Sequence, residues 1–169
     1  MSADAPALRA REILKKRSVD VLPDAARVSA SHEHHDAFFG GLLEAAFLVA
    51  SADGTVSKEE VGSLIDLVSE VGGEGVTPSE LAGMVYEFSA TMEKEGRQSR
   101  FDALAAAVGD PSARREILGF ASLVALCDHE LAPSELFVLH SLGKAFGFDA
   151  QAVSGIIKSV QGAMGDGAA

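Results

Sequence analysis

Two short acidic segments of the chain hold the residues whose types and spacing could do chemistry. In the first, Asp53 is followed seven residues later by Glu60, and in the second, Asp128 is followed at the same spacing by Glu135. The second segment also contains Glu130. Carboxylate oxygens are the ligands that hard cations such as Ca²⁺ and Mg²⁺ prefer. If the two segments meet on one surface, this spacing predicts a shared site for a divalent cation.

The same residues also have a purely structural interpretation. Glu60 lies three residues after Ser57, which is the spacing of a capping box, and Glu135 lies in the first turn of a predicted helix. Asp53 with Gly54 is a common pair at the end of a helix. An Asp at a helix C-terminus costs up to about 1 kcal/mol unless a bound cation, an Arg or a Lys compensates for it. Two interpretations therefore stay open: a cation site, or carboxylates that only cap helices and attract a basic partner.

The two acidic segments belong to an internal repeat, which is the most informative feature of the sequence. When residues 46–65 are aligned with residues 121–140, seven of the twenty positions are identical, at a constant offset of 75 residues. Each copy is predicted to be an apolar helix, an acidic turn and a second helix with Glu in its first turn. Two such units usually pack about a pseudo-twofold axis, which would bring the two turns together.

The elements that must position these turns are predicted to be helices. From Asp36 onward, apolar residues recur at helical spacing, and capping signals begin new helices near Ser57, Thr77, Asp110 and Ala132. No segment alternates with a period of two, so we expect an all-α fold: a compact bundle of about seven helices. We expect an N-terminal helix and a linker or loosely docked arm over residues 1–35, a domain over 36–163 and a flexible tail over 164–169.

Composition excludes several classes of function. The chain has 169 residues and a net charge of −11, which argues against binding to nucleic-acid backbones. Its single cysteine excludes an internal disulfide and a Cys-based zinc cluster. No nucleophile and base can be paired from known motifs, so an enzyme is not expected. No leader or membrane-spanning segment is expected either, and we predict a cytoplasmic protein without direct membrane insertion.

The two copies of the repeat resemble a known family. Residues 48–60 (LVASADGTVSKEE) and residues 123–135 are similar to the tellurite-resistance TerB-like family, and also to the N-terminal domain of a membrane-anchored DnaJ-type co-chaperone. The resemblance covers about residues 36–161. It departs from the family pattern at His129, where the family often has Gly.

The resemblance implies a fold, a site and a role. The fold would be all-α, with about seven helices and a pseudo-symmetric core. The site would bind a divalent cation, calcium first and magnesium as the alternative, through the two acidic turns. The role would be a non-enzymatic module in tellurite resistance and the stress response, acting through protein partners near the inner face of a membrane. The ligands that the resemblance implies are Asp53, Glu60, Asp128 and Glu135, with Glu130 and Glu59 as weaker candidates.

Overall fold

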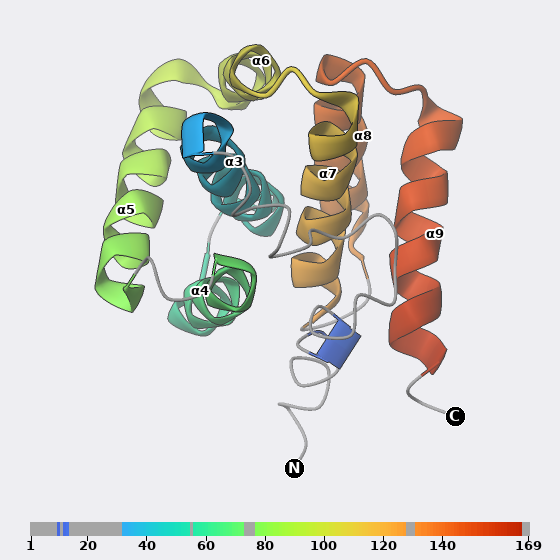
Figure 1. Cartoon of the computed structure of the whole chain (residues 1–169), viewed down its shortest axis with the longest axis horizontal. Coiled ribbons are helices and arrows are strands. Elements are labelled where there is room, and N and C mark those ends of the chain that lie inside the picture. The colour runs from blue at the N-terminus through green and yellow to red at the C-terminus, as the bar shows by residue number, and fades with distance from the viewer. Residues whose placement is uncertain are drawn as a thin grey trace.

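Every regular element in the described part of the chain is a helix (Figure 1). The structure is a computed structural model, and it describes residues 10, 12–13, 32–54, 56–72, 77–127 and 131–166. Within these residues there are seven helices and no strand, which confirms the predicted all-α class. The helices are α3 (His32–Ala50), α4 (Lys58–Gly72), α5 (Pro78–Glu95), α6 (Arg97–Ala107), α7 (Pro111–Leu126), α8 (Pro133–Ala145) and α9 (Ala150–Asp166).

The predicted capping signals do begin helices. In the capping box of α5, the Thr77 side chain accepts the N–H of Glu80, and the Glu80 carboxylate accepts the N–H of Thr77. Asp110 caps α7 by accepting the N–H of Ala113 at 3.1 Å, and Pro111 follows at the first helical position. These bonds satisfy backbone donors that a helix N-terminus otherwise leaves without partners.

Two helix boundaries differ from the predicted ones. Helix α3 begins at His32 rather than Asp36. The prediction followed apolar periodicity, and the polar first turn of this helix carries none. Helix α9 continues to Asp166, past residue 164 where the tail was predicted to begin, because Ala163 and Met164 pack against the core and hold its last turns.

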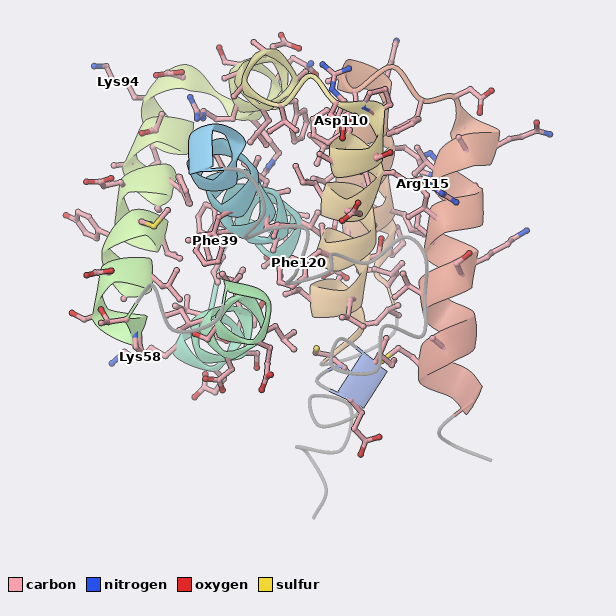
Figure 2. All side chains as sticks on the ribbon, viewed as in Figure 1. Phe39, Lys58, Lys94, Asp110, Arg115 and Phe120 are labelled. Carbon is pink, nitrogen blue, oxygen red and sulfur yellow. The ribbon has the colours of Figure 1, made fainter. Side chains whose placement is uncertain are left out.

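Helices α3 and α7 form the centre of the molecule and make the most extensive helix–helix contact in it. Both are apolar around most of their circumference, as expected for helices that are covered on all sides. Phe39 of α3 and Phe120 of α7 lie in the interior of the bundle (Figure 2). The buried residues of these two helices include Leu42, Leu43, Phe47, Leu48, Val49, Ile117, Leu118, Leu123 and Val124.

The contacts between helices are reciprocal. Helix α3 packs on α4 and α5, and α7 packs on α8 and α9, so each unit of the repeat contains three helices. Helix α3 also contacts α8 of the second unit, and α7 contacts α4 of the first. Helix α6 connects the units and packs on α5 and α8. This reciprocity is the pattern expected of two related units about a pseudo-twofold axis.

The second unit depends on one close helix crossing. A Cβ atom placed on Gly143 of α8 would lie 2.3 Å from Cγ2 of Val153 on α9, which is closer than real side chains approach. Val153 is β-branched and stiff at χ1, so it cannot easily move away. Glycine therefore allows α8 and α9 to pack closely at this crossing.

Two residues of the N-terminal segment belong to the core. Ala10 and Ile13 are 0% and 1% exposed and are part of the main hydrophobic cluster. Most of residues 1–31 lies outside the described residues. None of the described helices combines the length and the apolarity that a bilayer-spanning helix needs.

Candidate cation site at the acidic turns

The first acidic turn follows the C-terminus of α3. The backbone turns sharply there: the N–H of Ala52 is donated to the carbonyl of Val49, and the N–H of Gly54 to the carbonyl of Ser51. Gly54 has φ = 101°, a left-handed conformation that explains why glycine follows Asp53. The Asp53 side chain is exposed. The structure therefore places this predicted ligand at an accessible turn directly after a buried helix.

An arginine lies at the C-terminus of α3. Arg97, the first residue of α6, donates from Nη2 to the carbonyl of Ser51 at 2.7 Å and to the Ser51 hydroxyl at 3.4 Å. A guanidinium group at this position offsets the negative end of the helix dipole. Arg97 thus offsets part of the unfavourable negative charge at the turn that contains Asp53.

Glu60 has the capping role that its spacing predicts. Its Oε1 atom accepts the N–H of Ser57 at 3.2 Å, and its own N–H is donated to the Ser57 hydroxyl at 3.1 Å. This capping box begins α4. The second carboxylate oxygen of Glu60 takes no part in these bonds, so the capping role and a ligand role are geometrically compatible.

The second acidic turn is described at its two ends. Cys127, at the end of α7, is buried, as expected for a small apolar side chain rather than a nucleophile. Glu135 is 6% exposed, and its Oε1 atom accepts the N–H of Ala132 at 2.9 Å. Asp128 and Glu130 lie outside the described residues. Glu135 therefore resembles Glu60 in its backbone partner but is more deeply buried, and the meeting of the two turns stays a prediction.

Asp53, Glu60 and Glu135 suit a hard cation by their chemistry, and Glu60 and Glu135 suit helix capping by their geometry. Over the described ranges, which omit Asp128 and Glu130, no group of three or more His, Cys, Asp or Glu side chains is placed to hold a metal ion. Carboxylates suit Ca²⁺ or Mg²⁺ and not a soft metal. A cation site that includes Asp53, Glu60 and Glu135 thus also requires Asp128 and Glu130, the two remaining predicted ligands.

A partly buried ion pair between α3 and α6 was not predicted from the sequence. Both Glu44 oxygens accept from Arg100, with Oε2 at 2.6 Å from Nε and Oε1 at 2.9 Å from Nη2. Glu44 is 3% exposed, and the hydrogen bonds to it raise the pKa of the Arg100 guanidinium above its ordinary value. The missed signal is Glu44 itself, a single charged residue in the apolar stretch from Phe38 to Ala50. A carboxylate buried in such a helix requires a partner.

Arg114 of α7 was also missed, and it joins the ends of two other helices. Its guanidinium donates to the carbonyls of Ala105, Val108 and Phe146, the last two at 2.6 and 3.0 Å. It also lies over the Phe146 ring, 5.5 Å from the ring centre. These contacts satisfy carbonyls at the C-terminal ends of α6 and α8.

The arrangement defines a class of protein: an all-helical domain made of two related three-helix units, each with an acidic turn after a buried central helix. A family model described as "Tellurite resistance protein TerB" matches residues 40–156, which include both acidic turns. The chain belongs to the TerB family. No curated protein and no solved structure matches it. The similarity to a DnaJ-type co-chaperone domain stays a prediction.

Proposed function

We propose that this TerB-family domain is a non-enzymatic binding module of tellurite resistance and the stress response. In this proposal it binds a divalent cation, calcium first and magnesium as the alternative, and acts through protein partners at the cytoplasmic face of a membrane. The proposed ligands are Asp53, Glu60, Asp128, Glu130 and Glu135. The observation that carries the proposal is the duplicated Asp-to-Glu spacing on two helical hairpins whose first helices pack against each other.

The chemistry of the turns supports a role in binding. Asp53 and Asp128 follow the C-terminal, negative ends of two helices, where a carboxylate is unfavourable unless a cation or a basic side chain compensates for it. A cation shared by two units would bind the folded state alone, because the unfolded chain does not hold the turns together. Its binding would therefore stabilise the fold. The family description supports the link to tellurite resistance.

A second candidate function is a metal-free acidic domain that binds a basic partner. Three observations favour it. Glu60 and Glu135 both accept backbone N–H groups at helix N-termini, and Arg97 already places a positive charge at the C-terminus of α3. Under this alternative the carboxylates cap helices and supply surface charge.

Titration of Ca²⁺ into chelator-stripped protein tests the cation proposal. We expect a saturable heat signal and a higher melting temperature, corresponding to about 2.7 kcal/mol when free Ca²⁺ is at roughly a hundred times its Kd. The double variant Asp53→Asn with Asp128→Asn should lose both effects. The matched control is Asp66→Asn with Asp102→Asn, which removes the same charge from exposed positions on α4 and α6 and should keep both.

The opposite result supports the metal-free alternative. The metal-free alternative predicts neither a heat signal nor a change in melting temperature when Ca²⁺ or Mg²⁺ is added at millimolar concentration. In that case the double variant of Asp53 and Asp128 should melt at the same or a higher temperature, because two repelling charges are gone. It should also bind a basic partner more weakly than the control variant does.

A further inference from the structure

The net charge of the protein is concentrated on two neighbouring helices. Helices α4 and α5, which pack against each other, contain two lysines and eight carboxylates, a net charge of −6 out of −11 for the chain. The two lysines are Lys58, the first residue of α4, and Lys94, in the last turn of α5 (Figure 2). Residues 81–93 of α5 contain two carboxylates, Glu87 and Glu93, and no lysine or arginine, so this part of the helix has a negative field. A field of this kind attracts positively charged partners.

Helix α5 has one face in the core and one in solvent. Leu81 and Val85 are buried, and Met84, Phe88 and Met92 pack against the core from the same side. On the opposite side Tyr86 is 77% exposed. Ala82, Gly83 and Ala90, within one turn of Tyr86 on either side, are also exposed, as are Glu87 and Glu93. These six residues, Ala82, Gly83, Tyr86, Glu87, Ala90 and Glu93, are named the α5 face.

The α5 face has a composition that the stability of the fold does not require. Tyr86 is one of the two large apolar side chains exposed in the described residues, and the small residues around it leave its ring without cover. Tyrosine is enriched among the residues that supply most of the energy at protein interfaces. Alanine and glycine beside it let the backbone of a partner approach closely. The acidic residues set the charge of that partner.

We propose that the α5 face is a docking surface for a basic amphipathic helix of a partner protein. Tyr86 is the anchor that inserts between apolar side chains of that helix, and Glu87 and Glu93 pair with its Lys or Arg residues. A second copy of this chain would present the same acidic surface and be repelled, as would an anionic membrane. The inference rests on the protein-partner half of the proposed function and is independent of the cation site.

The chain provides its own reporter for a test. Tyr86 is the only tyrosine and there is no tryptophan, so the intrinsic fluorescence of the protein comes from the α5 face. The probe is an amphipathic peptide of about 15 residues with Lys on one side and Leu and Ala on the other, and without aromatic residues. We expect a saturable change in tyrosine fluorescence that weakens as salt is added. A scrambled peptide, and one with Glu in place of Lys, should bind weakly or not at all.

Variants then locate the surface, with a fluorescent label on the peptide and anisotropy as the measurement. We expect Tyr86→Ala to weaken binding about tenfold or more, as for an interface anchor. Glu93→Lys should weaken it and reduce its salt dependence. Phe137→Ala is the matched aromatic control, since Phe137 on α8 is 73% exposed. Gln151→Lys with Gln161→Lys on α9 changes the net charge by the same +2 as Glu93→Lys, and both controls should bind normally.

Several outcomes would overturn the proposal. The first is that the unaltered protein does not bind the Lys peptide. The second is that it binds the scrambled peptide equally well. The third is that the Tyr86→Ala and Glu93→Lys variants bind the Lys peptide as the controls do. A loss in Phe137→Ala would instead assign the surface to α8. Sedimentation that shows self-association through Tyr86 would assign it to a second copy. Each titration is run with chelator and with Ca²⁺, so that failure of peptide binding is separated from failure of cation binding.

Discussion

Three arginines satisfy polar groups that the packing of the helices would otherwise leave buried without partners. Arg97 satisfies the carbonyl of Ser51, Arg100 the carboxylate of Glu44, and Arg114 the carbonyls at two helix ends. A planar guanidinium with several donors suits such positions better than a lysine ammonium does. Most of the basic side chains of α6 and early α7 therefore serve the fold, and Arg100 also reaches the Glu95 carboxylate of α5 at 3.4 Å.

At the scale of single residues, we predict that Arg100→Leu destabilises the protein by about 3–5 kcal/mol, because it leaves the buried Glu44 carboxylate unpaired. The double variant Glu44→Leu with Arg100→Leu should recover most of that loss, since an apolar pair replaces the buried ion pair. Urea denaturation of the two variants gives both values. Glu95→Ala removes only the exposed ion pair at 3.4 Å and should cost less than about 1 kcal/mol.

A double variant that is no more stable than Arg100→Leu would contradict this account of the ion pair.

The raised pKa of Arg100 leads to a further expectation about pH. A raised pKa in the folded state adds stability that is fully present below the ordinary pKa of an arginine and is lost only above it. The contribution of the pair should therefore be constant from neutral pH to about pH 10, well below the Arg titration.

At the scale of helices, the starts of α5 and α8 form a natural comparison. Their sequences, Thr77–Pro78–Ser79–Glu80 and Ala132–Pro133–Ser134–Glu135, differ only in the capping residue. Ala132 has extended backbone dihedrals and accepts no side-chain bond, so only the Glu135 half of the capping box exists. We predict that Ala132→Thr stabilises the protein by about 1 kcal/mol. That corresponds to a rise of about 2–4 °C in melting temperature.

The reverse change is the control for this prediction. Thr77→Ala removes the side-chain half of the box at α5 and should lower the melting temperature by a similar amount. If Thr77→Ala lowers it and Ala132→Thr leaves it unchanged, then the buried Glu135 alone determines where α8 begins.

The elements were largely predictable from sequence, and the contacts between them were not. Capping residues act on neighbours three positions away, so Ser57, Thr77 and Asp110 indicated helix starts that the structure confirms. The partner of Glu44 lies 56 residues away, and that of the Ser51 carbonyl 46 residues away. Such pairings depend on how α6 crosses the ends of other helices, which no local pattern encodes. Of the predicted cation ligands, Asp53, Glu60 and Glu135 are placed at the turns or caps that their spacing indicated.

At the scale of the whole molecule, the core includes part of the N-terminal segment. Ile13 is 1% exposed although it precedes the repeat by more than thirty residues. We predict that Ile13→Ala costs about 2–5 kcal/mol, the range for truncating a buried aliphatic side chain. Thermal melting with circular dichroism measures this. Gln151→Ala at an exposed position of α9 should stay within about 0.5 kcal/mol of the unaltered protein. An Ile13→Ala variant with an unchanged melting temperature would indicate a loosely docked arm.

The mutual burial of α3 and α7 bears on how such a chain could have arisen. Each of these helices is covered in part by the other unit, so one unit alone would expose an apolar surface to water. An ancestor of half the length could have hidden that surface only by pairing with an identical molecule. Duplication and fusion of its gene would then have joined the two partners of a homodimer in one polypeptide. Each half could afterwards diverge, as the capping serine Ser57 and its equivalent Ala132 have done.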